Sequence, residues 1–309
     1  KFELSEKLEA ELSAIANDNI SGASLLFHRI LHLFPAIAEE LQATECDTAT
    51  FLAALSEKIY WLRPCMAPFA QLAFFLEHMA ANEFDLPVVR SVFSALPHSY
   101  VRKLKKEKQR IVDFALKAFR KHRKIMVHSR SSIVESFLFS WLKADPDREV
   151  WITESRPMCE GTMLAKALSA LPNRKVLLVD DARGIALEHV DAVLIGADAV
   201  SESVLINKIG RLALAFLSRE VKRPLYVVAE RIKFLPDNLV MSAEQQHAGA
   251  EIGSKLKNVE YFNYYFEHVP IKMIHRIITA SGVYSRAKIV EIFQSGQWNA
   301  FVIERAEVR

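Results

Sequence analysis

Residues 176–198, VLLVDDARGIALEHVDAVLIGAD, hold the pattern that decides the fold. Two short apolar runs, Val176–Val179 and Ala192–Ile195, flank a segment of helical character at about 182–189. Neither run alternates apolar with polar residues, so we expect each to be a strand that is buried on both faces. A strand, a helix and a second strand in this order predict a crossover unit of a parallel sheet.

The same alternation continues on both sides of this unit. Further apolar runs predict strands at Ile125–His128, Val150–Thr153 and Leu225–Ala229. Helical segments are expected between the strands, at roughly 131–144, 160–171 and 207–220. The fold class is therefore α/β, and residues 124–309 are expected to form a Rossmann-like domain with a mainly parallel sheet.

The first part of the chain has a different character. Only Gly22 of the nine glycines precedes residue 160, so this half is poor in turn residues. Apolar residues recur every three or four positions, beginning with Leu4, Leu8, Leu12 and Ile15. This spacing is typical of amphipathic helices and predicts an N-terminal helical domain over residues 1–97.

A long helix at 98–123 is expected to join the two domains, starting after Pro97 with Ser99 as its N-cap. From Arg102 to Lys124 the chain carries eleven Lys and Arg but only two acids. No aromatic residues interleave on this basic face, so we expect a solvated surface rather than a nucleic-acid site. Its charge could also steer anionic ligands toward the domain junction.

Composition limits the possible classes of protein. The 309 residues are 51% hydrophobic and 25% charged, which excludes intrinsic disorder, and the net charge is only +3. The three cysteines, Cys46, Cys65 and Cys159, suit neither a disulfide framework nor a zinc site and favour a cytoplasmic location. We recognise no membrane span and no signal peptide, and since the chain begins at Lys1 we expect the native start to lie upstream.

Polar residues follow every predicted strand. In an open α/β sheet, ligands bind beyond the carboxyl ends of the strands. We therefore expect a binding site to form from the residues at these ends, which are His128, Ser129, Arg130 and Ser131; Arg156; Asp180 and Asp181; Asp198; and Lys233.

The chemistry of these residues suits a phosphorylated sugar or nucleotide. The segments at Ser129–Ser132 and Asn207–Gly210 are expected to open helices, whose N-termini bind phosphate. Cations from Arg130, Arg156, Lys208 and Lys233 would add to this, while Asp181 and Asp198 could accept hydroxyl groups or act as general bases. We expect no cofactor and no metal, because the sequence has neither a dinucleotide fingerprint nor a Walker loop nor metal-ligand spacing.

Each residue also has a purely structural interpretation. His128 could be a packed, hydrogen-bonded histidine, Ser131 an N-cap, and Asp198 a helix cap or the partner of a nearby cation. Lys233 and Glu230 could form a surface ion pair that contributes little.

Several segments together resemble one superfamily. They are 195–200 (IGADAV), 207–210 (NKIG), 224–230 (PLYVVAE), 127–129 (VHS), 154–157 (ESRP) and 277–283 (IITASGV). The superfamily contains the alpha, beta and delta subunits of eukaryotic translation initiation factor 2B, ribose-1,5-bisphosphate isomerase and methylthioribose-1-phosphate isomerase. The resemblance covers about 125–290 and implies a helical bundle, a linking helix and a Rossmann-like domain that usually assembles as a dimer.

The resemblance also implies roles for particular residues. The isomerases convert an aldose 1-phosphate to a ketose with a cysteine after the first strand and the aspartate of a Gly-Ala-Asp motif. Here these positions hold Ser129 and Asp198, which are the candidate catalytic pair. Gly22 and Ala23 stand at the nearest match to the family's Arg-Gly-Ala phosphate loop, without its arginine.

Three functional hypotheses follow. The first hypothesis is a ligand-binding protein like the initiation-factor subunits, with weak or no isomerase activity. Its reason is that the aliphatic hydroxyl of Ser129 is a far weaker acid than a thiol, whose pKa is about 8.5. The second is an active aldose-ketose isomerase. The third is a regulatory subunit that acts through protein–protein contacts, and all three are compatible with a homodimer or higher homo-oligomer.

Overall fold

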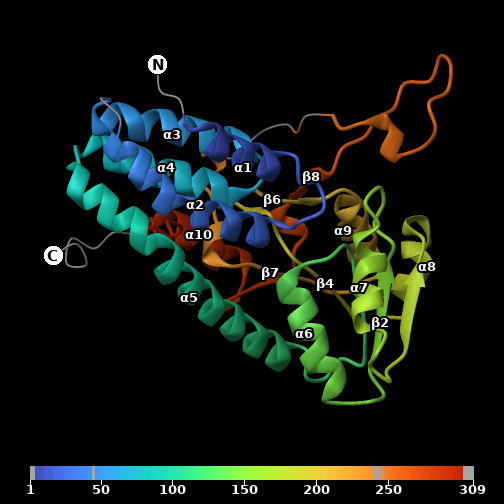
Figure 1. The fold of residues 1–309 in the computed structure, drawn as a ribbon. Coiled ribbons are helices and arrows are strands. Elements are labelled where there is room, and N and C mark those ends of the chain that lie inside the picture. Colours follow the sequence, from blue (N-terminus) through green and yellow to red (C-terminus); the bar gives the residue numbers. More distant parts are fainter. Residues whose placement is uncertain (1–3, 44–45, 240–243, 245, 302–309) are drawn as a thin grey trace.

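The computed structural model describes residues 4–43, 46–239, 244 and 246–301, so the ends of the expected domains at 1–3 and 302–309 lie outside it. A helical part and a part built on a parallel sheet lie side by side (Figure 1). The α/β class and the mainly parallel sheet are thereby confirmed. No described helix is both long enough and apolar enough to span a bilayer.

Four helices form the first part, namely α1 (Glu6–Ala16), α2 (Ala23–Ala43), α3 (Thr48–Leu62) and α4 (Ala67–Ala81). Two begin at side-chain caps, because Ser5 accepts a bond from the backbone of Leu8 and Asp47 from those of Ala49 and Thr50. Their apolar faces meet in one core that includes Leu26, Phe34 and Leu52. The helical periodicity of the sequence predicted this packing correctly.

The long helix begins earlier than expected. Helix α5 runs over Leu86–Ala118 and is capped by Asp85, so Pro97 lies inside it and Ser99 is not its N-cap. Instead, the Ser99 hydroxyl donates to the carbonyl of Ala95 at 2.9 Å. Pro97 removes a backbone hydrogen bond, but it is buried in the helix packing, and this burial outweighs the local preference.

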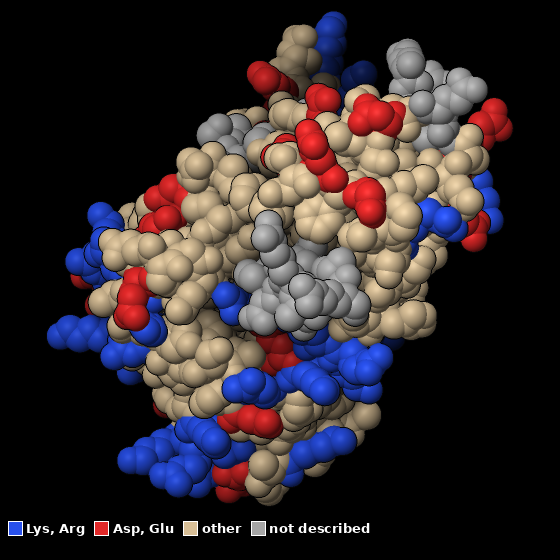
Figure 2. Space-filling model, turned by 90° about the vertical axis from the view of Figure 1, so that its left-hand side faces the viewer, with Lys and Arg blue, Asp and Glu red and all other residues tan. Residues whose placement is uncertain are grey.

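The basic face of α5 is open to solvent along much of its length. Arg102, Lys105, Lys106 and Arg110 are all exposed. Figure 2 looks onto the side of the molecule that is on the left in Figure 1. Lys and Arg gather over the lower half of this side of the molecule.

The main sheet has the strand order β10-β9-β7-β4-β1-β2-β3. All neighbours are parallel except β9 and β10. The five predicted strands are confirmed to within one residue at each end. The strands are β1 (Lys124–Val127), β2 (Glu149–Thr153), β3 (Lys175–Leu178), β4 (Ala192–Ile195), β7 (Leu225–Val228), β9 (Arg276–Thr279) and β10 (Gly282–Tyr284).

Helices cover both faces of this sheet (Figure 1). Helices α6 (Ser132–Lys143) and α7 (Glu160–Leu168) share one core with the end of α5. Helices α8 (Arg183–Glu188), α9 (Arg211–Glu220) and α10 (Arg286–Gln294) pack into a second core on the other face. The sheet is therefore doubly wound. Its parallel strands all have their carboxyl ends at the same end of the sheet.

A small antiparallel sheet was not predicted. It has the order β5-β6-β8 and consists of β5 (Ala199–Val200), β6 (Val204–Lys208) and β8 (Phe266–Pro270). Asn207 and Lys208 therefore end a strand, and the expectation that they open a helix is wrong, since α9 begins at Arg211 after the left-handed Gly210 (φ 97°). The pairing of β6 with β8 joins segments about 60 residues apart, which local patterns do not reveal.

Candidate functional site

A cavity of about 290 Å³ lies where the helical part meets the strand ends of the sheet part. The connection between α1 and α2 and the first turn of α2 form one wall. The ends of β1, β4 and β6 form another. Nine of the predicted site residues line it, namely Gly22, Ala23, Ser129, Arg130, Ser131, Asp198, Asn207, Lys208 and Lys233.

Four predicted residues do not reach the cavity wall, namely His128, Arg156, Asp180 and Asp181. The guanidinium of Arg156 is exposed and donates to the carbonyls of Glu251 and Ile252, at 3.3 and 3.1 Å. The Asp180 carboxylate accepts the backbone N–H groups of Ser155 and Arg156, and Asp181 is exposed. Strands β2 and β3 lie toward one lateral edge of the sheet, so their carboxyl ends lie farther along the sheet from β4 than that of β1. Arg156 is therefore not among the residues that line the cavity.

His128 lies beneath the cavity and is buried. Its Nε2 lies 2.9 Å from the carbonyl of Ile209, which can only accept, so Nε2 carries the proton and Nδ1 accepts from the hydroxyl of Thr153 at 2.6 Å. Burial, with the charge of Arg211, lowers the pKa of His128 well below its usual value. The side chain is thus a neutral, packed histidine that fixes the start of the β1–α6 loop.

Ser129 owes its position to a local backbone turn. It has a left-handed conformation, with φ 62°, and its backbone N–H donates to the hydroxyl of Ser155 at 2.7 Å. Ser131 then precedes α6 as its N-cap residue, but its side chain makes no cap bond. Gly196 permits this arrangement, because a Cβ there would lie 2.8 Å from the Ser131 side chain.

Asp198 connects the two parts of the molecule. Its backbone N–H donates to Ile206 in β6, and its carbonyl accepts from Ala67 at the start of α4. Among the described residues its carboxylate has no hydrogen bond or ion pair. Withdrawal from water raises the pKa of Asp198, while the charges of Lys233, Arg211 and Lys208 oppose that rise. The group can therefore accept a ligand hydroxyl or take part in proton transfer.

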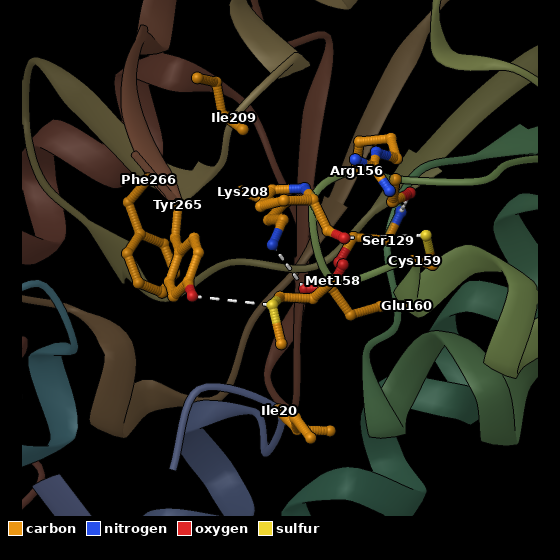
Figure 3. Close-up of polar contacts among 12 residues, drawn as sticks. Ile20, Ser129, Arg156, Met158, Cys159, Glu160, Lys208, Ile209, Tyr265 and Phe266 are labelled. Atoms are coloured by element: carbon orange, nitrogen blue, oxygen red, sulfur yellow. Dashed lines mark hydrogen bonds and ion pairs between the residues drawn. The ribbon is translucent and has the colours of Figure 1, made fainter. Parts of the chain in front are cut away.

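Three of the cavity cations carry a carboxylate partner. The ion pairs are Lys208 Nζ with Glu160 Oε1 at 2.7 Å, Lys233 with Glu230 at 3.2 Å, and Arg130 with Glu135 at 2.7 Å. The Lys233 and Glu230 side chains are only 6% and 4% exposed, so the alternative of a surface pair is wrong. Figure 3 shows Lys208 and Glu160 joined beside the ring of Tyr265.

Two arginines of the cavity were missed. Arg211 is 2% exposed, donates through Nη2 to the carbonyl of His128 at 2.9 Å, and leaves Nε and Nη1 without an acceptor among the described residues. Burial lowers its pKa to about 10, so it stays charged at neutral pH. Its place directly after the Asn207–Gly210 segment was the signal that could have identified it. Arg63 donates to the carbonyls of Ile15 and Asp18 and holds the α1–α2 connection.

The N-terminus of α2 presents free backbone donors to the cavity. The carboxylate of Asp18 accepts hydrogen bonds from the N–H groups of Ile20 and Ser21. This turn leads directly into the start of α2 at Gly22, Ala23 and Ser24. No described residue accepts from the N–H groups of those three, and the first turn holds no acid. Helix α6 begins at the same cavity. Two helix N-termini therefore face one space, an arrangement suited to phosphate.

A metal is a poor match for the site. Among the described residues, no group of three or more His, Cys, Asp or Glu side chains is placed to hold an ion. Cys159, which follows Arg156 in the loop after β2, does not line the cavity.

Comparisons with known proteins agree with the architecture. The profile of the initiation factor 2 subunit family matches residues 32–286. A translation initiation factor eIF-2B subunit 2-like protein of Pyrococcus furiosus is 28% identical over 284 residues, covering 91% of this chain and 97% of that protein. The ribose 1,5-bisphosphate isomerase of Thermococcus kodakarensis is 24% identical over 294 residues, covering 91% of both chains. The solved structure of a Pyrococcus horikoshii translation initiation factor eIF-2B has a TM-score of 0.77 at 25% identity, covering 93% of this chain and 100% of that one.

Proposed function

We propose that this chain, which belongs to the initiation factor 2 subunit family, binds a phosphorylated sugar or nucleotide in the cavity. The observation that carries this proposal is the convergence of two helix N-termini with Lys208, Arg211 and Lys233 on one cavity. The phosphate would accept from the N–H groups at Gly22 to Ser24, and the sugar hydroxyls would donate to Asp198. The chain is similar to initiation-factor subunits and to ribose 1,5-bisphosphate isomerases, and the name of the isomerases agrees with this ligand class.

Isothermal titration calorimetry tests this proposal. Ribose 1,5-bisphosphate, methylthioribose 1-phosphate and AMP would each be titrated into the full chain, with inorganic sulfate as the competitor. We expect saturable binding of at least one of the three that sulfate weakens. If none of them binds, the proposal fails.

We further infer that turnover is weak or absent. An aldose–ketose isomerase must open the sugar ring and then move a hydrogen from C2 to C1, while the C2 hydroxyl loses a proton and the C1 oxygen gains one. This chemistry needs two groups that exchange protons near neutral pH. Asp198 is suited to this, but the hydroxyl of Ser129 ionises far above neutral pH. The cavity therefore keeps a place for the ligand without a complete acid–base pair.

Ser129→Cys is the sharpest test of that inference, because it supplies a thiol at the same atom position. We expect the variant to convert ribose 1,5-bisphosphate at a rate that rises toward about pH 8.5, as the thiolate forms, while the wild type does not. Ser132→Cys, at the first residue of α6, is the control and should stay inactive. Equal turnover by the wild type would show that the chain is an active isomerase.

A homodimer is the assembly that we propose. The supporting observation is a set of large apolar side chains exposed on the neighbouring helices α8 and α9. Ile185 is 69% exposed and Phe216 is 54% exposed, with Leu217 beside it. Large apolar side chains that are exposed on adjacent helices are typical of association surfaces. A regulatory role through protein–protein contacts would use the same kind of surface.

A further inference from the structure

The positive charge of the molecule is concentrated on α5 and the residues that follow it. The segment from Arg102 to Lys124 has a net charge of +9, although the whole chain has only +3. The rest of the chain is therefore acidic, with a net charge of −6. A polyanion is attracted by this one segment and repelled by the remainder, so any binding of a polyanion would be local.

Seven cations of the segment form what we call the α5 basic surface. All seven side chains are exposed, and none makes an ion pair with a described carboxylate. They are Arg102, Lys105, Lys106, Arg110, Lys117, Arg120 and Lys121. At the end of the segment the situation differs, because Arg123 pairs with Asp145 and Lys124 with Glu149, at 3.5 and 3.4 Å. Figure 2 shows the gathering of Lys and Arg on this side of the molecule.

The two acids of the segment offset little of this charge. Glu107 is turned toward the body of the molecule, where its carboxylate accepts the backbone N–H of Arg231 at 2.6 Å. Asp113 is exposed and accepts from Gln109 at 3.0 Å. Like charges three or four residues apart on a helix repel each other, so the α5 basic surface weakens its own helix until an anion binds there.

The absence of exposed apolar groups selects the kind of anion. Protein interfaces are built around an apolar centre and are poor in lysine, and helices that lie on membranes need an exposed apolar face. Between residues 101 and 124, all of them described, no large hydrophobic side chain is exposed, because the apolar side of α5 is packed into the cores. A surface of cations alone suits the phosphate backbone of a nucleic acid.

The aromatic residues of the segment decide between single and double strands. Phe119 is buried, and Phe114 is half-buried with Lys117 Nζ 5.5 Å from its ring centre. Proteins that bind single strands stack the bases on accessible aromatic rings. The lack of such rings, for which we expected a solvated face from the sequence, excludes base stacking but not contact with the phosphates of a duplex.

We propose that the α5 basic surface binds the phosphate backbone of double-stranded nucleic acid without sequence preference. From Arg102 to Lys117 the helix rises by about 22 Å, and a duplex presents about 13 phosphates over that length. None of the seven residues lines the cavity. The proposal is therefore independent of the ligand that we propose for the cavity.

Fluorescence anisotropy with the full chain tests this proposal. The probes are labelled duplexes of about 20 base pairs, one of RNA and one of DNA with the same sequence. If about five of the seven cations contact phosphates, the affinity should fall about 500-fold between 50 and 200 mM salt. Binding of either duplex with this dependence supports the proposal, and the tighter duplex identifies the natural partner. No binding at 50 mM salt, or an affinity independent of salt, would overturn it.

Polyglutamate separates a nucleic acid from an acidic protein. An extended polyglutamate chain has about half the linear charge density of a duplex, so it should compete at least about tenfold more weakly. Equal or stronger competition by polyglutamate would overturn the nucleic acid as the partner and assign the surface to an acidic protein.

Charge-matched variants show whether the surface or the net charge is responsible. The combination of Arg102→Gln, Lys106→Gln and Arg110→Gln should make the slope of log affinity against log salt shallower by about 3, since each lost phosphate contact removes about 1. The control combines Lys143→Gln, Lys255→Gln and Lys257→Gln, which removes the same charge from exposed sites elsewhere and should leave the slope unchanged. Thermal unfolding of the first variant should not fall, because its helix loses a repulsion. Equal slopes in the two variants would contradict the assignment.

Discussion

The backbone N–H of Ala67 donates a hydrogen bond to the carbonyl oxygen of Asp198 over 3.1 Å. This contact fastens the start of α4 to the residue that carries the free carboxylate of the cavity. The helical part and the sheet part thus meet at Asp198, and neither encloses the cavity alone. Binding of a ligand and contact between the two parts are therefore expected to be coupled.

The N-terminus of α2 gives the first prediction. Gly22→Asp places a carboxylate where a phosphate is expected, and a side chain fits there because nothing lies within 4 Å of the added Cβ. We expect ligand affinity to fall at least about tenfold through charge repulsion, while the helix gains about 0.3–1 kcal/mol from its dipole. Calorimetry and thermal unfolding measure the two effects. Gly22→Asn, which lacks the charge, should keep most of the affinity, and equal losses in both variants would contradict the phosphate site.

The buried ion pair of Lys208 and Glu160 gives the second prediction. Glu160→Gln leaves the ammonium of Lys208 without its counter-charge, so the free energy of unfolding should fall by about 3 kcal/mol. The same change should raise the affinity for a phosphorylated ligand, which then neutralises Lys208, and saturating ligand should recover part of the lost stability. Denaturant unfolding with and without AMP measures this. Glu188→Gln on the exposed side of α8 is the control, and unchanged stability in Glu160→Gln would refute the prediction.

The raised pKa of Asp198 gives the third prediction. An acid whose pKa is higher in the folded than in the unfolded state adds stability below its unfolded pKa and loses it as the pH rises through the folded value. Asp198→Asn should therefore unfold a few degrees above wild type at pH 7, and the difference should close toward about pH 4. Asp181→Asn, at an exposed site, is the control variant. A difference that is independent of pH would mean that the ionised carboxylate is not the cause.

The exposed residues of α8 and α9 give the fourth. Light scattering after size exclusion should give twice the chain mass of 35.1 kDa for the wild type. Phe216→Glu should give the mass of one chain, because a charge at the centre of an apolar interface opposes association. Phe262→Glu, at a phenylalanine that is 78% exposed outside these helices, should remain dimeric. A monomeric wild type would contradict the proposed homodimer.

Local patterns predicted the strands of the main sheet and much of the site. Buried parallel strands are continuous apolar runs, and the residues that follow β1, β4 and β7 meet because parallel strands end at one edge. The same rule failed for Arg156, since it does not say how far each strand lies from the centre of the sheet. The start of α5 was missed because packing around Pro97 outweighs its local effect. Glu160 required the position of α7 relative to β6, which only the three-dimensional arrangement provides, whereas Arg211 directly follows the Asn207–Gly210 segment and was overlooked.

The location of a bound phosphate tests the central claim most directly. A crystal structure of the full chain with AMP should place the phosphorus within hydrogen-bonding reach of the backbone N–H groups of Gly22 to Ser24, beside Lys233 and facing Asp198. A phosphate bound instead on the exposed basic face of α5, with these groups untouched, would contradict the account.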